Sequence, residues 1–207
     1  MEPFIKVIDD FYENPDEIRK HALSQKYQKF TSSYYAGHDS IDRNILTDEC
    51  KTKLQNVFGI PVKFTQARYR YARSKDYSLG LIHSDINGDH GGKGYHAIIY
   101  LTPDEYKIRE DGISLYEHKT MGKIPSHTFD STVFLRDHFN ITKFNKYDTI
   151  EHKYNRAIIL DYDYFHAPYG INGFGNDIES SRLLHIIEIV PSHTVDTSQD
   201  YRMYSSV

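Results

Sequence analysis

The sequence predicts a mainly β domain with N-terminal helices, an α+β arrangement whose strands form an antiparallel sandwich or jelly roll. Two amphipathic helical segments precede Pro61, and short runs rich in β-branched and aromatic residues follow it. Helices followed by many strands favour a sheet with helices packed on one face, because βαβ units would alternate the two kinds of element. The runs are VKFTQARYRYA, LGLIHSD, YHAIIYL, GISLYEH, YDTIEHKY, RAIILDYDYF and RLLHIIEIV.

The N-terminal elements have predictable ends. Residues 4–11 alternate apolar and polar side chains, which indicates a strand. A helix over 15–27 is expected next, with Asn14 as its N-terminal cap. The polar stretch 31–44 is expected to be a loop, and a second helix is predicted over 47–59 with a glycine at its C-terminal cap.

The region 117–146 interrupts the run of strands. Its segment DSTVFLRDHF is expected to form a short helix capped by Asp130. The region is long enough to be a lid or a substrate-facing insertion.

The composition is that of one globular domain spanning residues 1–207, since 39% of the residues are hydrophobic and no linker divides the chain. A formal charge of −4 with scattered Lys and Arg makes nucleic acid a less favoured partner. Cys50 is the single cysteine, which excludes an internal disulfide or a multi-cysteine metal site and indicates a cytoplasmic location. No apolar run is long enough to cross a bilayer, so no membrane partner is expected.

A candidate metal site begins at His83 and Asp85. Residues two apart at a strand end project the same way and can hold one ion with an imidazole and a carboxylate. With 12 histidines and 29 acids, roughly one or two such pairs arise by chance. His166 strengthens the case because it ends the apolar run RAIILDYDYF and precedes a loop. Two histidines and one carboxylate leave open coordination positions, as non-haem Fe(II) oxygenases require, although zinc enzymes also use this set.

Arg182 is a candidate anion-binding residue. It lies sixteen residues after His166 and shares one face of the run RLLHIIEIV with Leu184 and Glu188. A guanidinium in an apolar lining needs an anion, and the distal carboxylate of a dicarboxylic cosubstrate would accept two parallel hydrogen bonds from it. The alternative is a structural salt bridge with an acid such as Glu188 or Asp177.

Several segments together carry a family resemblance. The order HSDINGDHGGKGYHAIIYLT, DGISLYEHKTMG and FHAPYG, followed by Arg182, resembles the Fe(II)/2-oxoglutarate-dependent oxygenases of the prolyl-hydroxylase-like branch. The resemblance runs from the first helix to Val190. Asp111 and Ile113 depart from the usual Gly-Gly-Thr pattern, and the Ser that many members have two residues after the arginine is absent here.

The resemblance implies a double-stranded β-helix in which His83, Asp85 and His166 hold iron and 2-oxoglutarate chelates the iron through its keto acid end. Arg182 would bind the distal carboxylate of 2-oxoglutarate. Tyr100 or Tyr71 would assist it.

The activity that the resemblance implies is hydroxylation of a protein side chain or a small metabolite, with Fe(II), 2-oxoglutarate and O2 as cofactor and cosubstrates. Two alternatives stay open. One is a metal- or carbohydrate-binding jelly-roll module without turnover, which would not need Arg182, and the other is a structural protein that has inherited the fold.

Overall fold

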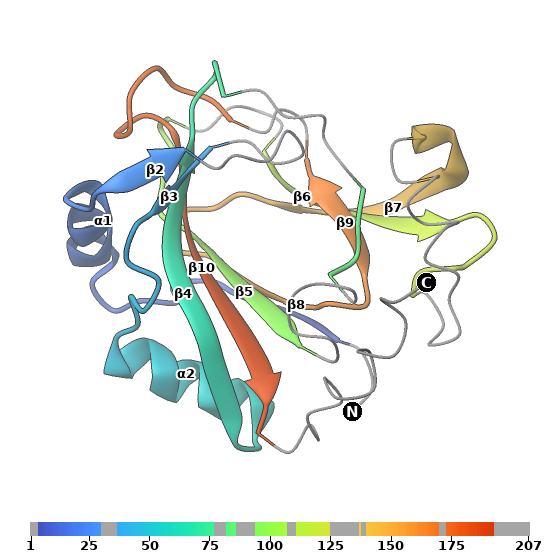
Figure 1. The fold of residues 1–207 in the computed structure, drawn as a ribbon, viewed down its shortest axis with the longest axis horizontal. Helices are drawn as coiled ribbons and strands as arrows, with labels where there is room; N and C mark the ends of the chain where they lie inside the picture. The colour runs from blue at the N-terminus through green and yellow to red at the C-terminus, as the bar shows by residue number, and fades with distance from the viewer. Residues whose placement is uncertain are drawn as a thin grey trace, which may run out of the picture.

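Two antiparallel sheets form the body of the molecule in a computed structural model of the chain (Figure 1). The larger sheet has the strand order β1-β8-β5-β10-β4-β3-β2, and the smaller sheet has the order β7-β6-β9. The structure describes residues 4–29, 37–76, 82–85, 94–106, 111–124, 137, 140–169 and 173–192. Within them the elements are β1 (Ile5–Ile8), α1 (Pro15–Leu23), β2 (Tyr27–Lys29), β3 (His38–Ser40), α2 (Asp48–Phe58), β4 (Val62–Ala72), β5 (Tyr95–Tyr100), β6 (Gly112–His118), the 3-10 helix η1 (Ile141–Lys143), β7 (Phe144–Glu151), β8 (Ala157–Asp161), β9 (Phe165–Pro168) and β10 (Arg182–Pro191).

The chain passes back and forth between the two sheets. After β5 in the larger sheet it forms β6 and β7 of the smaller one, then returns for β8, crosses again for β9 and ends in the larger sheet with β10 (Figure 1). Every pairing between two of these strands is antiparallel. Sandwiches of the jelly-roll type are built by such crossings. The prediction of a mainly β, jelly-roll-like domain with N-terminal helices is therefore confirmed.

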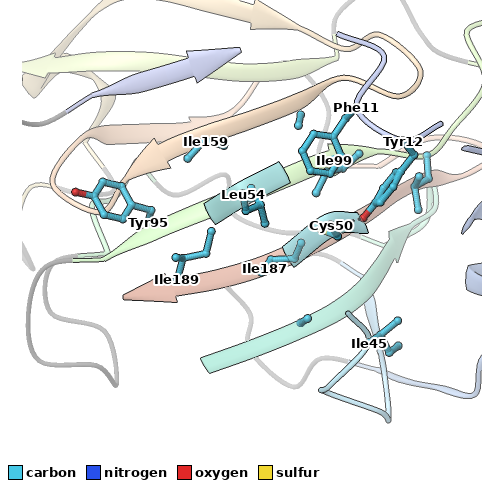
Figure 2. Close-up of a cluster of buried hydrophobic side chains, with 14 of the residues drawn as sticks. Phe11, Tyr12, Ile45, Cys50, Leu54, Tyr95, Ile99, Ile159, Ile187 and Ile189 are labelled. Atoms are coloured by element: carbon cyan, nitrogen blue, oxygen red, sulfur yellow. Dashed lines mark hydrogen bonds between the residues drawn. The ribbon is translucent and has the colours of Figure 1, made fainter. Parts of the chain in front are cut away.

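The larger sheet has two differently covered faces. Helices α1 and α2 lie over one face, which we call the outer face (Figure 1). A core of apolar side chains fills this layer, with Cys50 and Leu54 of α2 over Ile99, Ile159 and Ile187 of the sheet (Figure 2). The smaller sheet packs against the opposite, inner face through a second core, which contains Ile98, Tyr100, Ile113, Leu115, Ile158, Leu160, Leu184 and Ile186.

Helix α2 has the predicted ends. The Thr47 side chain accepts a hydrogen bond from the Cys50 backbone N–H at 3.2 Å, and Gly59 closes the helix in the left-handed conformation at φ 62°. Helix α1 differs from the expectation. Asn14 makes no side-chain capping bond, and the helix ends at Leu23 because the chain then enters β2, which pairs with β3.

Two further expectations need correction. The run RAIILDYDYF is not one strand, because the Asp161 side chain accepts a hydrogen bond from the Asp163 backbone N–H at 3.0 Å and turns the chain between β8 and β9. The expected loop 31–44 contains β3.

The region 117–146 is only partly described. It includes the end of β6 and the start of β7, which pair with each other in the smaller sheet, so these parts are sheet and not insertion. The helix expected in DSTVFLRDHF lies outside the described residues apart from Asp137, and so does its cap Asp130. No helix in the described ranges combines the length and apolar character needed to cross a membrane.

Candidate metal centre

The two histidines of the predicted site are brought together by a backbone bridge. The His83 N–H donates to the His166 carbonyl at 3.0 Å, and the His166 N–H donates to the His83 carbonyl at 2.8 Å. Residues paired in this way project their side chains to the same side. The two imidazole rings accordingly lie next to each other, with their centroids 4.4 Å apart.

Asp85 reaches the same point from the segment after His83. Its backbone N–H donates to the Tyr162 carbonyl at 2.8 Å, which fixes the segment beside the turn between β8 and β9. The Asp85 carboxylate lies 3.7 Å from His83 Nε2 and 3.5 Å from His166 Nε2. The candidate ligand atoms of these three residues all lie within 4.8 Å of one another, so the structure brings the predicted triad together.

The protonation states of His166 and Asp85 suit a cation. His166 Nδ1 lies 3.0 Å from the Tyr164 carbonyl, which can only accept, so Nδ1 carries the hydrogen and Nε2 keeps its lone pair. Burial and the neighbouring His83 lower the pKa of His166 to about 4, which keeps the ring neutral at pH 7. Burial opposes ionisation of Asp85, but His96 and His83 outweigh it and hold the pKa of this carboxyl far below its ordinary value.

One polar atom of the triad is unsatisfied. Oδ2 of Asp85 is buried and accepts no hydrogen bond from the residues that the structure describes. A buried carboxylate with an unsatisfied oxygen is costly, and a cation held by this carboxylate would reduce that cost by compensating its charge. Two imidazole nitrogens and a carboxylate are donors that both Fe(II) and zinc accept, so the residues present fit a divalent transition metal.

Arg182 has an internal partner on the inner side of the fold. Its Nε donates to Oδ1 of Asp111 at 2.9 Å, and its Nη2 donates to the Gly112 carbonyl at 3.4 Å. Oδ2 of Asp111 in turn contacts His152 Nδ1 at 2.5 Å, and His152 Nε2 lies 2.8 Å from the Thr102 carbonyl. These bonds leave further N–H donors of the guanidinium for another acceptor.

The acid partner of Arg182 is thus Asp111 and neither of the two acids named from the sequence. Glu188 accepts from Nη1 of Arg68 at 2.6 Å, and Asp177 is an exposed acid that accepts from Ser180. Burial alone would lower the pKa of Arg182, but Asp111 outweighs it, and the guanidinium stays charged.

The two candidate tyrosines lie on opposite faces of the larger sheet. Tyr100 is fully buried in the inner core, and the guanidinium carbon of Arg182 is 5.8 Å from its ring centre. Its hydroxyl makes no hydrogen bond to the described part of the chain, and burial raises its pKa.

Tyr71 does not lie at the site. It is paired in register with Leu183 and therefore shares the outer face with it, whereas Arg182 projects to the inner face. Its ring stacks on His38 at a centroid distance of 4.7 Å and packs edge-on against Tyr27. The expectation that Tyr71 assists Arg182 is wrong, because side chains alternate along β4 and Tyr71 falls on the face that points away.

His96 is a neighbour of the triad that the sequence prediction left without a role. Its Nδ1 lies 3.3 Å from Oδ2 of Asp85. The signal was present in the run YHAIIY, since His96, Ile98 and Tyr100 alternate onto one face and Tyr100 was already assigned to the site.

Comparisons with known proteins agree with this fold. No family profile and no curated protein matches the sequence. Among solved structures, the α-ketoglutarate-dependent epimerase SnoN of nogalamycin biosynthesis matches with a TM-score of 0.59 and 11% identity over 91% of this chain and 78% of its own. HygX from Streptomyces hygroscopicus, solved with nickel, 2-oxoglutarate and hygromycin B, matches with a TM-score of 0.56 and 13% identity over 94% and 85%. An oxidoreductase of the 2OG-Fe(II) oxygenase family from Burkholderia pseudomallei matches with 0.54 and 9% over 93% and 86%. The chain therefore has the fold of these non-haem 2-oxoglutarate enzymes.

Proposed function

We propose that the chain is a non-haem Fe(II)- and 2-oxoglutarate-dependent oxygenase with a double-stranded β-helix fold, in the prolyl-hydroxylase-like branch. The observation that carries the proposal is the convergence of His83, Asp85 and His166, whose ligand atoms lie within 4.8 Å of one another around an unsatisfied carboxylate oxygen. Three protein ligands leave positions open for a chelating cosubstrate and O2.

The position of Arg182 favours iron with 2-oxoglutarate over a zinc centre. Strand β6 links the two parts of the site, since its Leu115 pairs with His166 and its Gly112 carbonyl accepts from Arg182. Three residues of strand span about 10 Å. A five-carbon dicarboxylate bound to the metal at one end would extend along β6 toward the guanidinium with the other, whereas a zinc centre has no need of this arginine.

Each residue of the site then has a definite part. His83, Asp85 and His166 hold the ion, and Arg182 binds the distal carboxylate with the Tyr100 hydroxyl as a second donor. Asp111 holds the guanidinium through Nε and so fixes the plane in which its other N–H groups point. With Fe(II) bound, 2-oxoglutarate and O2 supply an oxidative reaction in which the keto acid becomes succinate and CO2 and the substrate is hydroxylated.

The substrate that we propose is a small polar molecule or a protein side chain. HygX has been solved with hygromycin B bound, and this favours the small molecule. Nucleic acid is less favoured, because the chain has a formal charge of −4.

A metal-binding module without turnover is the second candidate, and the Arg182–Asp111 ion pair is the observation that favours it. An arginine that already has a buried acid as its partner does not require a cosubstrate. The two candidates differ in whether 2-oxoglutarate binds next to the metal.

The test is anaerobic addition of Fe(II) and then 2-oxoglutarate, followed by visible absorption. A metal-to-ligand charge-transfer band is expected in the wild-type protein and not in His166→Ala. Arg182→Ala should weaken 2-oxoglutarate binding far more than Fe(II) binding, and Tyr71→Phe, on the outer face, is the matched control that should change neither. If the folded wild-type protein binds Fe(II) but gives no charge-transfer band with 2-oxoglutarate, the metal-binding module without turnover is the correct candidate.

A further inference from the structure

His96 of β5 lies on the inner face of the larger sheet, directly beside the candidate metal centre. Its Nδ1 is 3.3 Å from Oδ2 of Asp85, and its Nε2 is 4.0 Å from Oε1 of Glu188. The rings of His96 and Tyr162 pack edge-on, with their centroids 4.6 Å apart. The imidazole therefore stands between two carboxylates and is held by an aromatic neighbour.

The geometry separates His96 from the candidate metal ligands. Among the described residues, the group of side chains that could share one ion consists of His83, Asp85 and His166, and His96 does not belong to it. Its near contact is with Oδ2 of the Asp85 carboxylate.

A chain of charged side chains supports His96 from behind. Arg68 donates from Nη1 to Oε1 of Glu188 at 2.6 Å, and its Nε lies 3.3 Å from Oδ2 of Asp39. Asp39 is fully buried and accepts two bonds from Arg70, at 2.5 and 2.9 Å. Glu188 is thus held by Arg68 of β4, which Asp39 of β3 supports, and its carboxylate faces the far side of the His96 ring.

We propose that His96 is a positioning residue for Asp85, an inference that rests on the proposed function. Since an ionised carboxylate can only accept, the hydrogen between the two groups belongs to His96 Nδ1. From 3.3 Å that N–H can donate to Oδ2 of Asp85 when the ion is held through Oδ1, and so favours attachment through a single oxygen. A carboxylate that bound through both oxygens would occupy a position that the cosubstrate or O2 needs.

The test uses two substitutions of nearly equal shape. The side-chain amide of Asn occupies about the position of His Nδ1, so His96→Asn keeps a donor for Asp85. His96→Leu has similar bulk and no donor. The measurements are the Fe(II) dissociation constant under anaerobic conditions and the visible ligand-field spectrum of the Co(II)-substituted protein, which reports on coordination without turnover.

We expect His96→Leu to weaken Fe(II) binding by about 10–100-fold and to change the Co(II) spectrum, because supporting residues of metal ligands have effects of this size. His96→Asn should stay close to wild type in both. If His96→Leu does not fold, His96→Gln replaces it. The Gln amide lies at about the position of His Nε2 and offers no donor at the Nδ1 position, so this variant should weaken Fe(II) binding as much as is expected of His96→Leu.

The outcomes separate this inference from the proposed function. If the wild-type protein binds neither Fe(II) nor Co(II), the proposed function fails. If the wild-type protein binds both ions and the Asn, Leu and Gln variants bind them equally well with the same spectrum, only the positioning role fails. Loss of binding in His96→Asn as complete as in His83→Ala would make His96 a ligand, and that also overturns the positioning role.

Discussion

The buried histidines on the two sides of the larger sheet have different partners. On the outer face, His185 Nδ1 lies 2.6 Å from the Tyr12 hydroxyl and its Nε2 lies 2.8 Å from the Ile45 carbonyl, so both nitrogens have neutral partners. On the inner side, His166 of β9 in the smaller sheet uses one nitrogen for a backbone carbonyl and directs the other toward the Asp85 carboxylate. Both rings have their pKa lowered to about 4, mainly by burial.

Burial and a lowered pKa therefore do not by themselves distinguish a structural histidine from a candidate ligand. The distinguishing feature is the partner of the second nitrogen. On the outer face it is satisfied within the protein, and on the inner face it converges with a carboxylate that has an unsatisfied oxygen. Substitutions on the outer face should change stability alone, whereas those on the inner face should separate stability from ligand binding.

The largest loss in the free energy of unfolding is expected from Asp111→Ala. This change leaves the buried guanidinium of Arg182 without its acid and His152 without its partner. Removing one member of a buried ion pair costs about 3–5 kcal/mol of the free energy of unfolding. Urea denaturation should show this loss, with exposed Asp177→Ala as a control that leaves the midpoint unchanged. A loss below about 1 kcal/mol would mean that the Asp111–Arg182 pair adds little to the stability of the fold.

A smaller loss in the free energy of unfolding is expected from Tyr12→Phe on the outer face. The Tyr12 hydroxyl contacts His185 Nδ1 at 2.6 Å and Cys50 Sγ at 3.4 Å, and the substitution removes both contacts from the core. The expected cost is about 1–2 kcal/mol, with no change in the Fe(II) dissociation constant. Thermal unfolding and anaerobic metal titration of the same preparation measure the two quantities. A change in metal affinity would show that the two faces are coupled.

The smallest change in stability is expected from Tyr100→Phe. The Tyr100 hydroxyl is buried and makes no hydrogen bond to the described residues, so its removal should cost nothing or stabilise the protein by up to about 1 kcal/mol. If this hydroxyl donates to the distal carboxylate, 2-oxoglutarate should bind more weakly to the variant while Fe(II) affinity is unchanged. Equal 2-oxoglutarate affinity in the two proteins would remove Tyr100 from the site.

The sequence predicted those features whose causes are local. The ends of α2 follow from Thr47 and Gly59, which act within one turn of the helix. Tyr100 was named only from the family resemblance, and the structure places it in the inner core. The grouping of His83 with His166 came from their places at strand ends and from the family resemblance, and their role as metal ligands stays a prediction.

Features that depend on distant partners were missed. Arg182 pairs with Asp111, which is 71 residues away, and no local pattern distinguishes that acid from Glu188 or Asp177. Helix α1 ends early because β2 pairs with β3, a contact that its own sequence does not encode. Tyr71 was placed at the site without its register, and the pairing with Leu183 puts it on the other face.

The most direct test of the metal centre is anomalous diffraction from crystals grown anaerobically with Fe(II) and 2-oxoglutarate. Data collected at the iron edge should give one strong peak about 2.0–2.2 Å from Nε2 of His83, a carboxylate oxygen of Asp85 and Nε2 of His166. No peak among these three residues, or a peak held by other side chains, would contradict the account.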